Sequence, residues 1–197
     1  MPLAARDSIT GLVLAGGQGS RIGGADEGLL EFHGLPLIEH VLGRLARQVD
    51  TVMISANRNQ ERYRALVPRV IGDAGGGQRY HGPLAGIHAG LVHAPTAWVV
   101  VVPCDVPQLS RALVARLAEA VNARGVLAAC ARSESRLQPV FCLLATALVA
   151  PLGAHIERGG RAVHSWLAEV GAAPVDFDDP MAFRDLGTLA ALSGGPA

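Results

Sequence analysis

A glycine-rich segment near the start of the sequence has the residue types that suit phosphate binding. Four glycines surround Arg21, namely Gly16, Gly17, Gly19 and Gly23. Glycine lets the backbone approach a phosphate closely and direct its N–H groups at it. A guanidinium adds paired, charge-assisted hydrogen bonds to phosphate oxygens. On its own, however, a glycine-rich turn is more often structural, so the segment leaves two interpretations open, a structural turn and a phosphate-binding loop.

Two widespread phosphate-binding motifs do not fit this segment. A dinucleotide-binding GxGxxG motif that begins at Gly17 needs a glycine where Ile22 stands. A Walker A motif that begins at Gly19 needs a lysine where Ala25 stands. Neither of these two nucleotide sites is therefore expected in this chain.

Asp105 is a second residue whose position suggests chemistry. It follows residues 99–102, four valines that indicate a strand buried on both faces. A carboxylate just beyond such a strand can hold Mg²⁺ together with phosphate oxygens and water. The alternative is an N-cap or turn aspartate ahead of a helix predicted at 111–123. The residues alone leave both interpretations open.

The elements that must position these residues alternate along the chain. Short β-branched runs predict strands at 9–14, 51–55, 97–102 and 139–143. Helical periodicity predicts helices at 37–48, 58–66, 83–93, 111–123 and 161–170. This alternation predicts a three-layer α/β fold with a mainly parallel sheet. Because ligands gather at the carboxyl ends of such strands, the loops after them are expected to form the site.

Composition narrows the class of protein. The 197 residues, half of them hydrophobic, suffice for one domain with a sizeable core. The 17 basic residues, all arginine, balance 17 acidic ones, so no overall field attracts nucleic acid or an anionic membrane. No apolar stretch is long enough to span a bilayer. Three cysteines without a CxxC motif argue against a disulfide framework. We therefore expect a cytoplasmic protein with neither nucleic-acid nor membrane partners.

The glycine segment and the residues after it resemble the nucleotidyltransferase signature LAGGxxxRMGxxxKxLxxxxGxPL. Residues 14–23 read LAGGQGSRIG, residues 26–29 read DEGL and residues 35–37 read LPL. Later segments resemble, in the same order, those of the molybdenum cofactor guanylyltransferases. They are NRNQ at 57–60, Asp73, GPLAG at 82–86, PCDVP at 103–107, QP at 138–139 and VDF at 175–177. The resemblance covers residues 9 to about 192, and its combination of motifs is more specific than the glycine segment alone.

This resemblance implies a fold and a reaction. The fold is a single Rossmann-like nucleotidyltransferase domain, spanning residues 1–197, in which residues 8–110 bind the nucleotide and residues 111–192 bind the acceptor. The reaction is the Mg²⁺-dependent transfer of GMP from GTP to molybdopterin or its molybdenum-loaded form, giving molybdopterin guanine dinucleotide and pyrophosphate. Molybdoenzyme apo-proteins or their chaperones are further expected partners.

The resemblance also assigns site residues. The triphosphate is expected at a loop that comprises Leu14, Ala15, Gly16, Gly17, Gly19 and Arg21. Other nucleotide-side residues are Glu27, Asn57, Asp73, Gly82 and Pro83, with Asp73 accepting hydrogen bonds from the base. Asp105 is expected to hold Mg²⁺, and Arg161 to line the molybdopterin side. Arg21 and Asp105 are the two expected catalytic residues.

Residue 27 departs from the family pattern. The signature places a lysine in Asp-Lys-Gly-Leu, whereas this chain has Glu27 there, so an anion replaces a cation. Three hypotheses follow. Glu27 turns to solvent while another arginine, such as Arg79, replaces the lysine; or Glu27 helps to hold a second Mg²⁺; or the chain binds nucleotide or the cofactor but catalyses poorly.

A second departure lies near the carboxyl end of the chain. The family often has Asn-x-Asn-Thr-Pro before its last helix, and here Asp185 and Gly187 occupy the two asparagine positions. The resemblance places this region near the second substrate. The use of CTP, or of another acceptor, is therefore an alternative to the use of GTP and molybdopterin.

Overall fold

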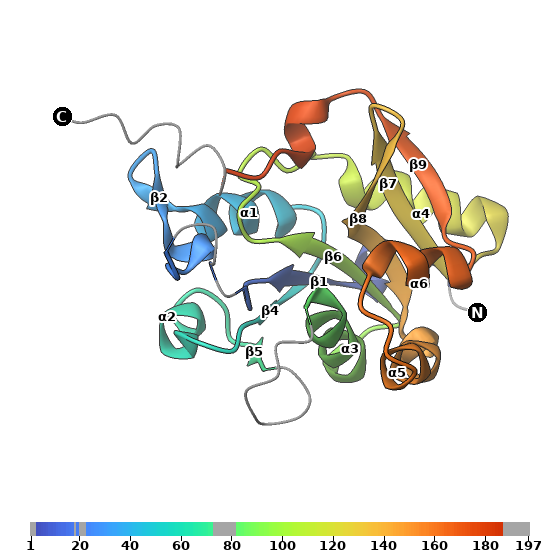
Figure 1. The fold of residues 1–197 in the computed structure, drawn as a ribbon. Helices are drawn as coiled ribbons and strands as arrows, with labels where there is room; N and C mark the ends of the chain where they lie inside the picture. Colours follow the sequence, from blue (N-terminus) through green and yellow to red (C-terminus); the bar gives the residue numbers. More distant parts are fainter. Residues whose placement is uncertain (1–2, 18, 20–22, 73–81, 187–197) are drawn as a thin grey trace.

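The computed structural model describes residues 3–17, 19, 23–72 and 82–186, and Figure 1 shows their mixed α/β arrangement. The described strands are β1 (Ile9–Leu14), β2 (Glu31–Phe32), β3 (Leu35–Pro36), β4 (Thr51–Ser55), β5 (Val70–Ile71), β6 (Trp98–Pro103), β7 (Ala128–Ser133), β8 (Arg136–Ala145) and β9 (Ala173–Phe177). The described α-helices are α1 (Leu37–Leu45), α2 (Gln60–Arg64), α3 (Pro83–His93), α4 (Leu113–Arg124), α5 (Val149–Glu157) and α6 (Val163–Glu169). Short 3-10 turns are η1 (Arg6–Ser8), η3 (Glu27–Leu29), η4 (Thr146–Leu148) and η5 (Pro180–Phe183).

Seven strands form one sheet in the order β5-β4-β1-β6-β8-β7-β9. Parallel pairs join β1 to β4 and β6, β4 to β5, and β7 to β9. Strand β8 pairs antiparallel with both β6 and β7, so within the described sheet it alone runs against the other strands. The predicted mainly parallel sheet is confirmed. Strands β2 and β3 form a separate antiparallel hairpin.

Helices cover both faces of this sheet, which gives the predicted three layers. Helices α1 and α4 pack on one face, and α3, α5 and α6 pack on the other. The first core layer lies between the sheet and helices α1 and α4, and the second lies between the sheet and helices α3, α5 and α6. Along β6, Val100 and Val102 belong to the first layer, whereas Val99 and Val101 belong to the second. Trp98 lies in the first layer and Trp166 in the second, and both are fully buried.

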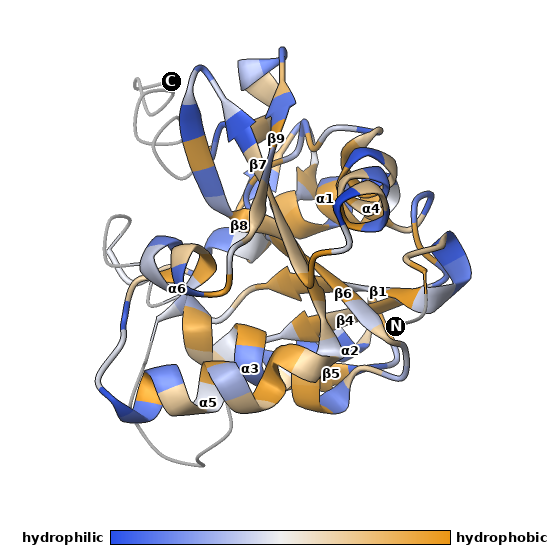
Figure 2. Cartoon of the chain, turned by 90° about the vertical axis from the view of Figure 1, so that its right-hand side faces the viewer, coloured by the Kyte–Doolittle hydropathy of each residue, from blue (hydrophilic) through white to orange (hydrophobic). Residues whose placement is uncertain are grey.

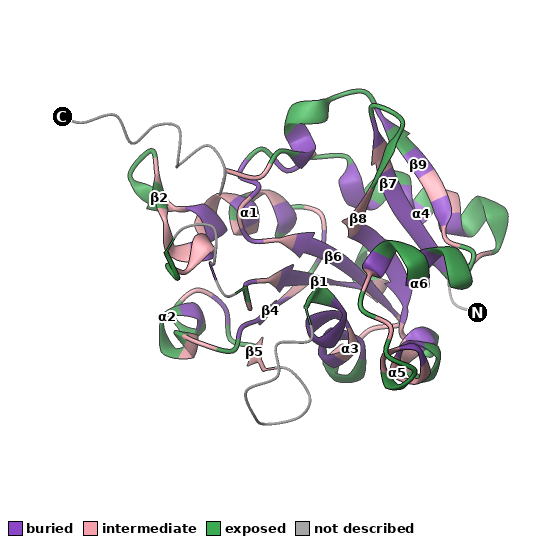
Figure 3. Ribbon diagram, in the orientation of Figure 1, coloured by how far each residue is buried: buried purple, intermediate pink, exposed green. Residues whose placement is uncertain are grey.

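Hydropathy and burial follow these layers. Figure 2 shows hydrophobic residues gathered in the strands and on the helix sides that face them, with hydrophilic residues toward the β7–β8 hairpin tip. Figure 3 shows the central strands buried almost throughout. None of the described helices has both the length and the apolar character needed to cross a membrane.

The strand order reverses at β1. The chain passes from β1 to β4 and β5 on one side, and then returns to place β6 on the other side of β1. In open α/β sheets, ligands bind outside the carboxyl ends of the strands at such a switch point. The last residues of β1 and β6, Leu14 and Pro103, are partners in register, and the Cys104 N–H donates to the Leu14 carbonyl at 3.1 Å. The loops after β1 and β6 therefore start side by side.

The predicted elements agree best in the first half of the chain. The predicted strands 9–14 and 51–55 and the predicted helix 83–93 have the observed bounds. Strand β9 and helix α5 were not predicted, and β8 is longer than the predicted strand 139–143. Two prolines explain part of this difference. Pro174 is tolerated because β9 is an edge strand, and Pro151 because it lies in the first turn of α5.

The close packing of α3 on β1 leads to a test of the core. A Cβ on Gly90 would lie 2.2 Å from Leu12 Cδ2, and Leu12 is fully buried. Gly90→Ala should therefore lower the free energy of unfolding, measured by urea denaturation, by about 1–3 kcal/mol. The control is Gly43→Ala on the exposed side of α1, where a Cβ meets nothing within 4 Å. This control should raise stability by about 0.5–1 kcal/mol. Equal stabilisation by both changes would contradict the packing.

Candidate active site

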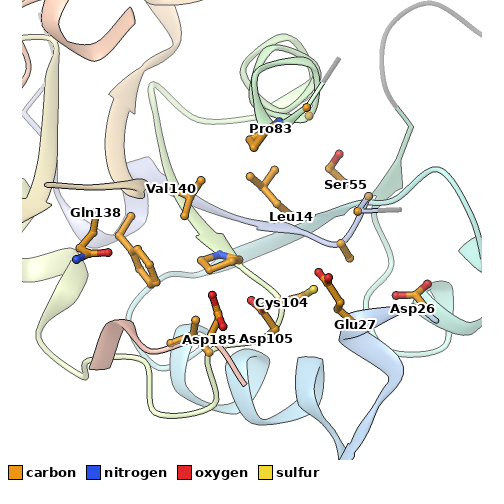
Figure 4. Close-up of a pocket in the computed structure, with 18 of the residues that line it drawn as sticks. Leu14, Asp26, Glu27, Ser55, Pro83, Cys104, Asp105, Gln138, Val140 and Asp185 are labelled. Carbon is orange, nitrogen blue, oxygen red and sulfur yellow. The ribbon is translucent and has the colours of Figure 1, made fainter. Parts of the chain in front are cut away.

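One pocket lies at the carboxyl ends of β1, β4 and β6, at the reversal in strand order (Figure 4). We call it the switch-point pocket, and its volume is about 590 Å³. Its lining residues are Leu14, Ala15, Gly16, Gly17, Asp26, Glu27, Ser55, Gly82, Pro83, Gly86, Pro103, Cys104, Asp105, Val106, Gln138, Val140, Phe141, Phe183 and Asp185. A pocket of this size can hold a nucleotide-sized ligand.

The glycine-rich loop after β1 forms one wall of this pocket. The Ala15 N–H donates to the Ser55 carbonyl at 2.8 Å, which extends the pairing of β1 with β4 beyond the strand end. A Cβ on Gly17 would lie 3.3 Å from Glu27 Oε2. Glycine at this position therefore gives the Glu27 carboxylate room beside the loop, and Figure 4 shows Glu27 pointing into the pocket. The hypothesis that Glu27 turns away to solvent does not describe this arrangement.

Asp26 anchors the segment that carries Glu27. Its carboxylate accepts hydrogen bonds from the Tyr63 hydroxyl at 2.5 Å and from Asn59 Nδ2 at 2.8 Å. Tyr63 is fully buried, and this burial, followed by the hydrogen bond to Asp26, raises the pKa of the phenol above its ordinary value. The phenol therefore stays protonated at neutral pH and keeps donating to Asp26. The start of η3, and with it Glu27, is fixed by these contacts with α2 and its N-cap residue.

Arg58 holds the same segment through the backbone. It donates to the Gly24 carbonyl at 2.6 Å and to the Ala25 carbonyl at 2.7 Å, and its Nε lies 3.7 Å from Asp26 Oδ2. Gly19 packs closely against the same turn. A Cβ at this position would lie 1.8 Å from the Ala25 carbonyl oxygen, so no larger residue fits there. The Arg58 guanidinium is thus occupied by loop carbonyls and does not line the switch-point pocket.

Asp105 and Asp185 come together on another side of the pocket. Asp105 lies in the turn after β6, and its carbonyl accepts a hydrogen bond from the Leu186 N–H at 3.0 Å. This bond brings the segment after η5 against the β6 loop, so both carboxylates line the same cavity (Figure 4). Because α4 begins at Leu113 with Ala112 as its N-cap, the helix-cap interpretation of Asp105 is wrong. Carboxylate oxygens in this arrangement are suitable ligands for a hard divalent cation.

The side of the pocket near β8 is more apolar. Gln138, Val140 and Phe141 come from β8, which runs antiparallel to β6 and so brings its first half to the carboxyl end of β6. Phe183 packs edge-on against Phe141, with ring centroids 4.9 Å apart. This side can accept a flat or apolar part of a second ligand, while Gln138 offers an amide for hydrogen bonding.

The charges around the pocket have one sign. The described lining contains four carboxylates and no arginine, lysine or histidine. The four carboxylates are those of Asp26, Glu27, Asp105 and Asp185. A polyphosphate bound here must therefore be neutralised by a bound cation, or by residues outside the described ranges such as Arg21 and Arg79.

Cys104 lines the pocket but is not suited to act as a nucleophile. Burial, and next the Asp105 carboxylate, raise the pKa of its thiol well above the ordinary value. A cysteine reacts as the thiolate, and this environment disfavours the thiolate. Its sulfur lies 3.2 Å from the position of a Cβ on Gly28, so Cys104 acts as a small packing residue under η3.

The structure brings together most of the predicted site residues that it describes. The pocket is lined by Leu14, Ala15, Gly16, Gly17, Glu27, Gly82, Pro83 and Asp105. Asn57 is exposed outside this lining, but its Nδ2 lies 3.4 Å from the position of a Cβ on Gly16. Arg161 is exposed and does not line the pocket. Arg21, Asp73 and Gly187 lie outside the described residues.

Several lining residues were not predicted as site residues. The polar ones are Asp26, Ser55, Gln138 and Asp185. Ser55 ends a predicted strand, so its place at the carboxyl edge of the sheet could have been inferred. Gln138 lies on β8, and no short sequence motif predicts that this strand runs antiparallel to its neighbours. Asp26 and Asp185 belong to the motif segments described above, but the directions of their side chains depend on contacts with residues distant in sequence.

Comparison with known proteins finds relatives of this chain. The family model described as a MobA-like NTP transferase domain matches residues 11–172. A protein of Cupriavidus taiwanensis named molybdenum cofactor guanylyltransferase is 43% identical over 192 residues, covering 95% of this chain and 96% of its own.

Solved structures share the fold. Molybdopterin-guanine dinucleotide biosynthesis protein A from Archaeoglobus fulgidus has a TM-score of 0.67 and 24% identity, covering 86% of this chain and 83% of its own. A Mycobacterium tuberculosis protein in complex with manganese has a TM-score of 0.63 and 16% identity, covering 87% of this chain and 89% of its own. At these identities the likeness concerns the fold alone.

The anchoring of Asp26 can be tested through Tyr63. Tyr63→Phe removes the buried hydroxyl that donates to the Asp26 carboxylate. A hydrogen bond to a charged group contributes roughly 1.5–3 kcal/mol, so the free energy of unfolding should fall by about that amount. A double-mutant cycle with Asp26→Asn is the control, since the two losses should not add if the contact is real. Additive losses would show that the two residues act independently.

Proposed function

The chain belongs to the MobA-like NTP transferase family, and on that premise we propose that it is a molybdenum cofactor guanylyltransferase that transfers GMP from GTP to molybdopterin. The relative that carries this name matches almost the whole chain. One observation in the structure carries the proposal. The glycine loop, Asp105 and the Gly82–Pro83 start of α3 meet in one pocket at the switch point of the sheet.

The proposed reaction joins two anions. A phosphate oxygen of molybdopterin forms a bond to the α-phosphorus of GTP. The bond from that phosphorus to the oxygen bridging the α- and β-phosphates breaks, and pyrophosphate leaves with the electron pair. The products are molybdopterin guanine dinucleotide and pyrophosphate. Since charge accumulates on the transferred and departing phosphates, stabilising that charge is the main task of the site.

The chain offers backbone N–H groups for this task. Helix α3 begins at Pro83, and its N-terminus faces the pocket, where a helix N-terminus favours an anion. Gly82 precedes it with φ +68°, a conformation that favours glycine. In the proposal these groups and the loop at residues 14–19 hold the triphosphate together with Arg21, while Asn57 and Asp73 lie near the guanosine.

A divalent cation fits the carboxylates present. Asp105 and Asp185 present oxygen ligands in the pocket, and such ligands are those that Mg²⁺ prefers. We propose that Asp105 holds Mg²⁺, with Asp185 as a neighbouring carboxylate. The cation would neutralise part of the phosphate charge and align the two reacting groups. The protein's own contribution is the fixed position of Asp105 at the end of a buried strand.

We assign residues 8–110 to nucleotide binding and 111–192 to acceptor binding. The apolar side of the pocket supports this division, because Gln138, Phe141 and Phe183 all follow residue 110. Arg161 stands exposed outside the pocket lining, so its contact with molybdopterin stays a prediction. Molybdoenzyme apo-proteins or their chaperones remain proposed recipients of the product.

Nucleotide binding tests the function directly. GTP, CTP, ATP and UTP should be titrated into the protein with Mg²⁺ and with EDTA. We expect selective GTP binding that needs Mg²⁺ and that weakens at least about tenfold in Asp105→Asn, because a lost charged ligand changes the binding free energy by roughly 1.4 kcal/mol or more. Turnover is then checked by pyrophosphate release with molybdopterin.

A matched control separates the site from a general charge effect. Asp178→Asn changes the same charge at an exposed position after β9, outside the pocket lining, and should leave GTP binding unchanged. Preference for CTP would redirect the proposal to a cytidylyltransferase. Binding of GTP without pyrophosphate release would support a homologue that binds nucleotide but has lost turnover.

Glu27 provides a second test, because its carboxylate faces the glycine loop in the pocket. Glu27→Lys replaces a repelling group with an attracting one, so the Kd for GTP with Mg²⁺ should fall about tenfold or more, with Glu27→Gln between lysine and wild type. The measurement is equilibrium titration alongside the rate of pyrophosphate release.

Glu31→Lys is the control for this test, since it makes the same charge change on an exposed residue of β2 outside the pocket lining. It should change the Kd less than about threefold, as expected for an exposed, screened charge. Loss of binding in Glu27→Lys would contradict a simple charge defect. That result would instead favour a direct role for Glu27 in holding a cation.

A further inference from the structure

A second cavity lies at the opposite end of β1 from the switch-point pocket. Its volume is about 450 Å³. Ile9, the first residue of β1, lines this cavity, whereas Leu14, the last residue, lines the switch-point pocket. Because a strand rises about 3.3 Å per residue, the two sites are separated by about 16 Å along β1. The two cavities share no lining residue.

This cavity combines an apolar floor with a cationic rim. The floor consists of buried side chains, namely Ala4, Ile9, Val114 and Ala118. The rim carries three exposed arginines, namely Arg6, Arg47 and Arg111. Glu119 is the one carboxylate among the described lining residues. We call this site the basic cavity, since its charge is opposite to that of the switch-point pocket.

Two of the rim arginines have no side-chain partner among the residues that the structure describes. In the ranges that the structure describes, neither Arg47 nor Arg111 makes a hydrogen bond or an ion pair. Arg6 pairs with Asp50 at 3.0 Å, but both side chains are more than half exposed. Such a pair is screened by solvent and contributes little, so Arg6 can also turn toward a ligand.

The walls of the basic cavity are held in place by hydrogen bonds. Gln48 accepts from the Val114 N–H at 3.1 Å and donates to the Ser110 carbonyl at 2.9 Å. Asn122 accepts from the Ala4 N–H at 2.9 Å and donates to the Ala4 carbonyl at 3.0 Å. These bonds tie the N-terminal segment and the end of α1 to α4. The cavity is therefore shaped before any ligand arrives, which reduces the cost of binding.

We propose that the basic cavity binds a small molecule that carries a phosphate group on an apolar body. Guanidinium groups donate paired hydrogen bonds that match phosphate oxygens, and the buried floor suits an apolar body. Without a metal ion, such a ligand is attracted by the described charged side chains of the basic cavity and repelled by those of the switch-point pocket. That pocket presents four carboxylates and no cationic side chain among its described lining residues.

Phenyl phosphate is a suitable probe, because it has a flat apolar ring and no nucleobase. It is titrated into the full chain in EDTA, and the amide resonances of the protein are followed by NMR. We expect saturable binding with a Kd below about 1 mM. The shifts should concentrate at Ile9, Gln48 and Val114 and not at Leu14 and Asp105. Benzyl alcohol, which has the ring without the charge, should not saturate.

Variants with matched charge complete the test. The double variant Arg47→Ala and Arg111→Ala should weaken phenyl phosphate binding at least about tenfold, because each lost charged hydrogen bond contributes substantially. The control is Arg62→Ala with Arg124→Ala, which removes the same charge at exposed positions outside the cavity. It should bind as the wild type does. Absence of saturation, shifts confined to the switch-point pocket, or equal binding by both double variants would overturn the proposal.

Discussion

The parallel pairing of β1 with β6 is the interaction on which the switch-point pocket depends. It sets Leu14 opposite Pro103, and the Cys104 N–H continues the pairing beyond the strand ends. The glycine loop and Asp105 thereby face one cavity, although nearly ninety positions separate them in sequence. Antiparallel β8 then adds Gln138 from the other side of β6. The register of this one buried strand pair therefore sets the relative positions of the glycine loop and Asp105 in the switch-point pocket.

The sequence was informative where local pattern and tertiary structure agree. β-Branched residues in β1, β4 and β6 predicted the strands, and the carboxyl-edge rule then located the glycine loop and Asp105. It failed for β9, whose APVDF segment contains a proline and forms a strand at the edge of the sheet, where it pairs with β7 alone. The direction of Glu27 was also beyond local reasoning. It depends on Asp26 meeting Tyr63, thirty-seven positions away.

In the described part of this lysine-free chain, most arginines that make contacts bind backbone carbonyls or carboxylates of the protein itself. Arg44, Arg58 and Arg69 donate to backbone carbonyls, which a planar guanidinium with several N–H groups does well. Arg132 and Arg158 pair with Asp176 and Glu169. The overall charge is zero, but positive and negative side chains gather in different parts of the molecule. Among the described residues, carboxylates line the pocket at one end of β1, and arginines, two of them without a side-chain partner there, line the cavity at the other end.

The two tryptophans of the chain mark its two core layers. Trp98 lies on the α1–α4 face of the sheet and Trp166 on the face covered by α3, α5 and α6, and neither lines a cavity described above. Intrinsic fluorescence at the tryptophan wavelengths thus reports on the packing of the sheet and not on site occupancy. Replacing either indole leaves a single emitter confined to one layer. The loosening of each face can then be followed separately during unfolding.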